Sequence, residues 1–195
     1  MKKIFILLLL VIFNTEIVYA QDFYANYYSN TLSTNTYNSP YSIIHKTGNK
    51  EIKIEKSCTN TKCIITINMK WLNMPKIRSY DVLGARFEGT SLLNDPITTL
   101  FLDDVKKNIT MYTVKKSNGF GVSFKLPTGG SSLRITQIFE VSVGGTVYAS
   151  YQHANKTSTL DKSKDYSISK NGYGGVFLFS TLSSSYYDGM GGVYI

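Results

Sequence analysis

Residues 49–71, NKEIKIEKSCTNTKCIITINMKW, alternate apolar and polar side chains on both sides of a short polar segment. A period of two is typical of half-buried β-strands. The segment therefore predicts two antiparallel strands, 49–57 and 64–71, joined by a short loop. This pairing places Cys58 directly opposite Cys63.

The apolar side chains fix the register of this hairpin. Successive side chains of a strand point to opposite faces, so a slip of one residue would turn the whole apolar set away from the core. In the predicted register Lys53 and Glu55 lie on the opposite face. Two apolar pairs then oppose each other across the strands: Ile52 with Met69, and Ile54 with Ile67.

Cys58 and Cys63 are the only cysteines of the chain. Directly opposed residues of antiparallel strands are close enough for a disulfide, which an oxidising compartment permits. A metal site needs further ligands, and the chain has only two histidines. The spacing also differs from the Cys-x-x-Cys motif of thiol oxidoreductases. We predict a structural disulfide between Cys58 and Cys63 and no metal site.

The N-terminal residues predict export. Lys2 and Lys3 precede the unbroken apolar run 4–13, and residues 18–20 (VYA) suit signal peptidase. A helix of ten residues spans about 15 Å, roughly half of a bilayer's hydrocarbon core, which disfavours a membrane anchor. We predict a signal peptide at 1–20. The protein is then secreted, either extracellular or periplasmic where the envelope has an outer membrane.

The rest of the chain predicts an all-β protein. Residues 21–40 are rich in Tyr, Asn, Ser and Thr and predict an N-terminal arm or weak strand. From 41 to 195, short segments of β-branched and aromatic residues recur about every ten residues, separated by turn-forming residues. This rhythm is typical of a sandwich. We predict a single antiparallel β-sandwich domain over 41–195, Ig-like or jelly-roll-like.

Two further hairpins follow from turn signals. Asn118-Gly119 is the strongest two-residue turn signal of the chain, and it pairs Met111 with Leu126 and Thr113 with Phe124. The second hairpin turns through a three-residue loop at 144–146. That loop aligns three apolar pairs: Phe139 with Tyr151, Val141 with Ala149, and Val143 with Val147.

Four weaker signals complete the prediction. Gly84 indicates a bulge or a close backbone approach inside strand 77–88. Asp103 and Asp104 are possible caps for a single helical turn over 103–108. Residues 176–179 predict a central strand, because they are apolar on both faces. Asp188-Gly189 predicts a bend before a short terminal strand.

The charge balance favours anionic partners. The chain has 21 Lys and Arg against 13 Asp and Glu, and removal of residues 1–20 lowers its net charge from +8 to +7. An anionic cell-wall polymer, an acidic glycan or phospholipid head groups fit such a charge, and no nucleic acid partner is expected. The lysines are scattered among acidic residues, which favours a solvated surface that maintains solubility over a dedicated anion site.

No motif of a phosphate loop, zinc protease, serine hydrolase or calcium loop occurs. His45 and His153 are the only possible imidazole bases, and His153 with Asp188 or Glu140 is the best arrangement for a small hydrolase. A glycosidase needs two carboxylates across a cleft. The candidates are Glu88, Glu140, Asp81 and Asp188, and their spacing selects no pair. We therefore predict no catalytic residue, no enzyme activity and no cofactor.

The aromatic residues suggest a contact surface. The chain holds 15 tyrosines, 10 phenylalanines and one tryptophan. A tyrosine offers a flat apolar ring with a polar tip, which suits sugar stacking, although sheets also favour tyrosine at half-buried positions. The ligand-binding candidates are Trp71, Tyr148, Tyr151, His153, Tyr186 and Tyr187.

These observations predict a secreted, non-catalytic binding or surface-interaction protein whose ligand is a cell-wall polymer or glycan. The alternative is a membrane-acting toxin or pore-former that inserts hairpin 111–126. Lys115, Lys116 and Lys125 make that hairpin costly to bury, which weighs against the alternative. A small secreted hydrolase is the least favoured function.

Overall fold

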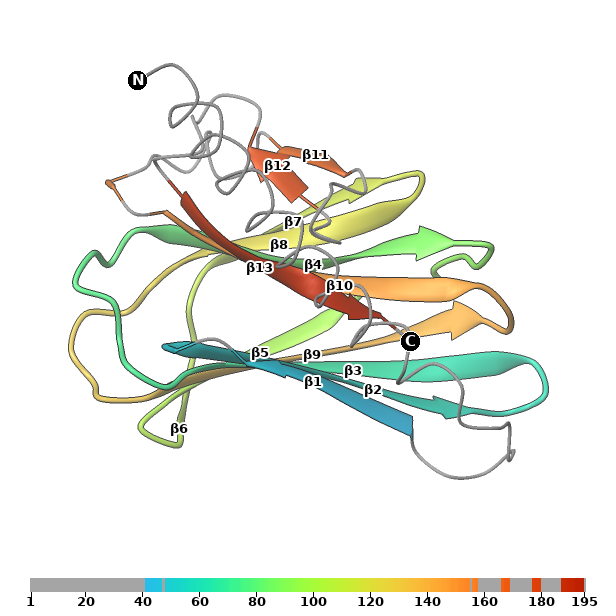
Figure 1. Ribbon diagram of the computed structural model, residues 1–195, viewed down its shortest axis with the longest axis horizontal. Helices are drawn as coiled ribbons and strands as arrows, with labels where there is room; N and C mark the ends of the chain where they lie inside the picture. The colour runs from blue at the N-terminus through green and yellow to red at the C-terminus, as the bar shows by residue number, and fades with distance from the viewer. Residues whose placement is uncertain are drawn as a thin grey trace, which may run out of the picture. The chain divides into compact units, whose positions relative to one another are not determined.

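A computed structural model describes residues 41–46, 48–154, 156–157, 166–168, 177–179 and 187–194. The predicted signal peptide at 1–20 and the arm at 21–40 lie outside the described residues. The described residues form an all-β structure in which two antiparallel sheets face each other (Figure 1). The predicted antiparallel β-sandwich is confirmed. No helix of the described residues is long and apolar enough to cross a membrane.

Strand order defines two large sheets and one small one. The first sheet has the order β1-β2-β3-β9-β5-β6, with bounds Tyr41–Lys46, Lys50–Cys58, Lys62–Trp71, Leu133–Ser142, Ile97–Leu102 and Val105–Lys107. The second sheet has the order β13-β10-β4-β8-β7, with bounds Tyr187–Tyr194, Thr146–Ala154, Tyr80–Glu88, Gly119–Lys125 and Met111–Lys116. The two-stranded sheet pairs β11 (Tyr166–Ile168) with β12 (Phe177–Phe179).

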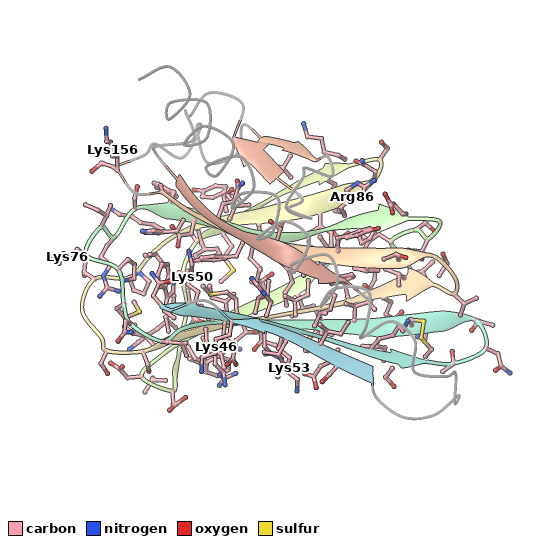
Figure 2. All side chains as sticks on the ribbon, viewed as in Figure 1. Lys46, Lys50, Lys53, Lys76, Arg86 and Lys156 are labelled. Atoms are coloured by element: carbon pink, nitrogen blue, oxygen red, sulfur yellow. A yellow bond between two sulfur atoms is a disulfide. The ribbon has the colours of Figure 1, made fainter. Side chains whose placement is uncertain are left out.

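The core lies between the two large sheets. Alternate residues of each strand point inward, as the period of two requires, and the rings of Phe120 and Phe139 meet edge to face at 5.0 Å. Lys50 is on the inner face of the first sheet, whereas Lys46 and Lys53 project from its outer face (Figure 2). Fully buried side chains come from both sheets, among them Ile52, Ile54, Ile65, Ile67, Met69, Phe120, Phe124 and Phe139.

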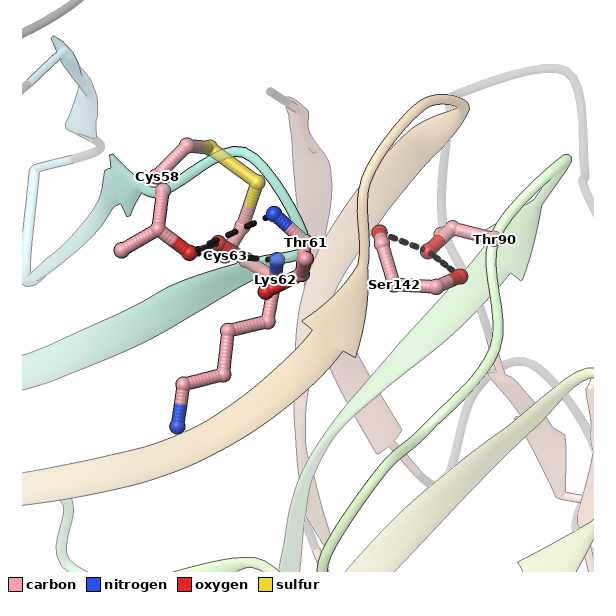
Figure 3. Close-up of a disulfide and its surroundings, with 7 residues drawn as sticks. Cys58, Thr61, Lys62, Cys63, Thr90 and Ser142 are labelled. Carbon is pink, nitrogen blue, oxygen red and sulfur yellow. Dashed lines mark hydrogen bonds between the residues drawn. A yellow bond between two sulfur atoms is a disulfide. The ribbon is translucent and has the colours of Figure 1, made fainter.

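The β2–β3 hairpin has the predicted register. Cys58 is opposite Cys63, and the two predicted apolar pairs oppose each other as well. The predicted disulfide is confirmed, and it joins residues whose Cα atoms are 4.0 Å apart (Figure 3). In the same view the Thr90 hydroxyl donates to the Ser142 carbonyl oxygen at 2.6 Å, which ties the loop after β4 to the end of β9.

The β7–β8 hairpin is shifted by two residues from the prediction. Met111 pairs with Phe124 instead of Leu126, so the turn residues are Ser117 and Asn118. Gly119 pairs with Arg86 in the ladder between β4 and β8. Because it is paired with β4, it is a strand residue and not a turn residue. A shift of two keeps every side chain on its predicted face, and the even-numbered apolar residues of 120–126 are buried.

The predicted hairpin at 144–146 is wrong. β9 pairs with β3 and β5 in the first sheet, whereas β10 pairs with β4 and β13 in the second. Gly144 and Gly145, with φ values of 85° and 73°, carry the chain from one sheet to the other. The apolar faces of β9 and β10 meet across the core instead of lying side by side in one sheet.

The predicted helical turn at 103–108 is also wrong. Asp103 and Asp104 have φ values of 49° and 61°, and they form the tight turn between β5 and β6. Two positive φ values in a two-residue loop are typical of a type I′ hairpin turn, and Asp tolerates this region better than most residues. The Asp103 carboxylate accepts backbone hydrogen bonds from Ser131 and Ser132 at 2.9 Å, which lowers its pKa.

Three smaller predictions also need correction. The ladders on both sides of β4 run through Gly84 without a register shift, so there is no bulge, and a close backbone approach stays a prediction. β12 pairs with β11 in the small sheet and is not a central strand of the sandwich. Asp188 and Gly189 lie within the predicted terminal strand, β13, opposite His153 and Gln152, because the β10 ladder keeps them extended.

Candidate functional site

Five polar or amphipathic side chains gather between the sheets. We call them the buried cluster: Lys50, Trp71, Asp81, Tyr151 and His153. The ladder between β10 and β4 sets Asp81 opposite His153, and Tyr151 shares the inward face with His153 because it is two residues away. Each of the five is at most 4% exposed, so the cluster is closed to solvent.

Hydrogen bonds connect four members of the cluster. The Trp71 indole N–H donates to the Tyr151 hydroxyl oxygen at 2.9 Å, and the Tyr151 hydroxyl donates to Asp81 Oδ2. His153 Nδ1 lies 2.8 Å from Asp81 Oδ1. Both carboxylate oxygens therefore have side-chain partners, as a buried carboxyl requires.

Aromatic packing encloses the same cluster. The Trp71 and His153 rings meet edge to face, with centroids 4.9 Å apart. Lys50 Nζ lies 5.1 Å from the Trp71 ring centroid, within cation–π range. Trp71 thus touches a hydroxyl, an imidazole and an ammonium group at once, so it is the central packing residue of the cluster.

Burial raises the pKa of Asp81 above its ordinary value of 3.8. The hydrogen bond and charge of His153, with hydrogen bonds from Tyr151 and the Ala154 backbone, oppose that rise without cancelling it. The folded protein therefore binds the proton of the Asp81 carboxyl group more tightly than the unfolded chain does.

The pH dependence of stability should report this shift. We expect the wild type to have a larger free energy of unfolding than Asp81→Asn by an amount that is greatest below about pH 4. This advantage should shrink as pH rises through the raised pKa, because the folded state must then bury a charged carboxylate. Urea denaturation of both proteins between about pH 3 and pH 8 measures the difference. A difference that grows with pH contradicts the assignment.

Of the residues proposed for hydrolysis, His153 has a partner that the sequence did not single out. Its Nδ1 pairs with Asp81, whereas Glu140 pairs elsewhere. Glu140 forms an ion pair with Lys62 at 2.7 Å, and Asp188 is the backbone partner of His153 between β10 and β13. His45 is half-buried on β1, and burial lowers the pKa of its imidazole.

The ligand-binding candidates lie mostly in the interior. Trp71, Tyr151 and His153 belong to the buried cluster. Tyr148 is also buried, and its hydroxyl donates to Glu88 Oε2 at 2.5 Å. Tyr186 lies outside the described residues, and Tyr187 is the first residue of β13. The role of all six candidates in ligand binding stays a prediction. The rings of the four buried candidates, which are Trp71, Tyr148, Tyr151 and His153, present no face to solvent.

Another charged feature crosses the outer face of the first sheet. One side chain from each strand lines up there through successive paired positions. We call this line the basic row. It contains, in order from β1 to β6, Lys46, Glu51, Lys70, Arg134, Phe101 and Lys106. Strands lie about 4.8 Å apart, so the row is about 24 Å long.

Charge in the basic row is poorly compensated. Within the described residues, none of its four cations forms an ion pair, although Glu51 stands between two of them. Lys70 and Arg134 are directly opposed, and like charges in that position destabilise a sheet. The Arg134 guanidinium lies 4.0 Å from the Phe101 ring centroid, which holds it over the sheet.

Sequence reasoning missed the buried cluster and the basic row, because each combines residues from several strands. The four cations of the basic row come from four strands, so along the chain they look scattered. One signal was available: the hairpin register already placed Glu51 and Lys70 together on the polar face. Lys50, on the same face as Ile52, was a second signal, because it put a charge on the apolar side.

Neither feature resembles a metal centre. Among the described residues, no three His, Cys, Asp or Glu side chains gather as they must to hold a metal ion. The exposed members of the basic row are cations and the buried cluster has one carboxylate. The arrangement is therefore suited to binding anions at the surface.

The chain matches no protein-family model, and no curated protein matches it. Among solved structures, it is similar to the pilus backbone protein RrgB from Streptococcus pneumoniae, with a TM-score of 0.40 and 10% sequence identity. The similar region covers 62% of this chain and 33% of the pilus protein, so the chain spans about a third of that structure. A similarity of this size assigns no function.

Proposed function

We propose that this chain is a secreted, non-catalytic surface-interaction protein that binds an anionic cell-wall polymer or glycan through the basic row. The observation that carries the proposal is the set of four cations, without ion pairs in the described residues, on one outer sheet face. A polyanion lying across the strands supplies the missing counter-charge and relieves the repulsion between Lys70 and Arg134.

The length of the basic row favours a polymer over a small anion. A single phosphate or carboxylate reaches one or two of the cations, whereas the row extends about 24 Å across six strands. An extended chain contacts all four cations at once, and it needs no cleft. The closed state of the buried cluster supports a non-catalytic role, because His153 and Asp81 are not accessible to a substrate.

Charge reversal in the basic row tests the proposal. We expect Lys70→Glu/Arg134→Glu to weaken retention on insoluble anionic cell-wall polymer at least about tenfold, because each cation near an anionic surface contributes about 1 kcal/mol. The chain from residue 21 is mixed with the polymer at low and moderate salt, and the bound fraction is measured after sedimentation.

The matched control changes the same charge elsewhere. Lys116 and Lys125 are exposed on β7 and β8 of the second sheet, so Lys116→Glu/Lys125→Glu has the same net charge as the test variant. This control should bind nearly as well as the wild type. Equal loss in both variants reduces the interaction to nonspecific attraction, and unchanged binding of the test variant refutes the proposal.

A further inference from the structure

A second line of outward side chains runs beside the basic row. It lies two residues along the strands, about 7 Å away, and paired positions connect it from β2 to β5. We call it the polar row: Lys53, Asn68, Thr136 and Thr99. Three of its four members are neutral groups that can both donate and accept hydrogen bonds. The two rows therefore differ in chemistry but share the outer face of the first sheet.

Hydrogen bonds hold the polar row in place. The Thr136 hydroxyl donates to Asn68 Oδ1 at 2.7 Å, and Asn68 Nδ2 donates to Glu55 Oε2 at 3.3 Å. Lys53 Nζ lies 2.7 Å from the other oxygen of Glu55. These side chains are fixed before a ligand arrives, which lowers the entropy lost on binding.

Arg134 links the two rows. Its Nη1 donates to the Thr136 hydroxyl at 3.3 Å, while its guanidinium rests over Phe101. A guanidinium has five N–H donors, so most of them remain for a ligand. Arg134 can therefore bind a carboxylate through two N–H groups while Thr136 and Asn68 contact neighbouring atoms of the same ligand.

We infer that the polymer is an acidic polysaccharide, an inference that rests on the proposed function. Its carboxylates lie along the basic row, and its ring hydroxyls hydrogen-bond with Asn68, Thr136 and Thr99. A sugar acid carries a carboxylate on one side of its ring and hydroxyls on the other, which matches two parallel rows of different chemistry. A polyphosphate has no hydroxyls and can only accept hydrogen bonds, so it leaves the acceptor oxygens of the polar row unmatched.

Two soluble polymers and one variant test this inference. Polygalacturonate and inorganic polyphosphate are compared at equal concentrations of charged groups, by isothermal titration with the chain from residue 21. We expect Thr99→Val/Thr136→Val to weaken polygalacturonate binding about five- to tenfold, because hydroxyl contacts are lost while side-chain volume is kept. Polyphosphate binding should fall less, because all four cations remain, although Arg134 loses its hydrogen bond to the Thr136 hydroxyl.

The control is Thr66→Val. Thr66 is on the outer face of β3, two residues beyond Asn68 and outside both rows, so its loss should affect neither polymer. Equal binding of both polymers by the wild type, with equal effects of the double variant on both, overturns the inference but leaves the proposed function standing. Failure of the wild type to bind either polymer overturns the proposed function and the inference with it.

Discussion

Replacing Trp71 with alanine is expected to lower the free energy of unfolding by about 4 kcal/mol. The indole is 2% exposed and fills the space between the two sheets where the buried cluster lies. Its loss leaves a cavity and removes the hydrogen bond to Tyr151, and Lys50 loses the ring beneath its ammonium group. Each of these effects destabilises the folded state.

The control for this prediction is Trp71→Phe. It keeps an aromatic ring but removes the N–H donor, so we expect a smaller loss, about 1 to 2 kcal/mol. Guanidinium denaturation followed by far-UV circular dichroism measures both variants, because Trp71 is the only tryptophan and its fluorescence disappears with it. A loss below about 1 kcal/mol for the alanine variant would show that Trp71 does not anchor the cluster.

Gly145→Ala is expected to lower the free energy of unfolding by at least about 3 kcal/mol. Gly145 has a φ of 73°, a region that alanine adopts only with strain. A Cβ at this position overlaps the carbonyl oxygen of Glu88 and the carbonyl carbon of Gly89. These are backbone atoms at the end of β4, so they cannot move aside without disturbing the sheet.

Gly144 provides the matched control, because its φ of 85° is similar but a Cβ there meets nothing within 4 Å. We expect Gly144→Ala to cost about 1 to 2 kcal/mol, from the backbone conformation alone. The yield of folded protein and the denaturation midpoint compare the two variants. Equal losses would mean that the close approach to β4 contributes nothing.

The sequence predicted the register of the β2–β3 hairpin correctly, because every determinant of that register lies within 23 consecutive residues. The same reasoning failed for β9 and β10. Their alternating apolar residues and two glycines are compatible with a hairpin and with a crossing between sheets, since both bury Phe139, Val141 and Tyr151. Only the distant partners β3 and β4 decide between the two, and a local pattern does not contain them.

Residue preferences were ambiguous at the tight turns. Aspartate favours helix N-caps and also tolerates positive φ, so Asp103-Asp104 fits a helical turn or a type I′ hairpin turn. Asn118-Gly119 is a strong turn signal, yet Gly119 pairs with β4 and belongs to a strand. In both places the competing conformations are close in energy locally, and the neighbouring strand selects one.

The candidate site was harder to predict than the fold. Lys46, Lys70, Arg134 and Lys106 become neighbours only once the order of the strands is known. The partner of His153 depends in the same way on the pairing of β10 with β4. Net charge suggested an anionic partner, which stays a prediction, but composition cannot say which cations share a face.

Both large sheets are completed by strands from late in the sequence. β9 lies between β3 and β5, and β10 pairs with β4. Trp71 therefore pairs with Leu133, and Glu88 with Thr146, across long sequence separations. A chain that crosses a membrane N-terminus first, as residues 1–20 predict, forms its disulfide hairpin early because those contacts are local. The sandwich itself cannot close until the second half has followed. For a chain exported as residues 1–20 predict, this order of contacts would delay folding until most of the chain had crossed the membrane.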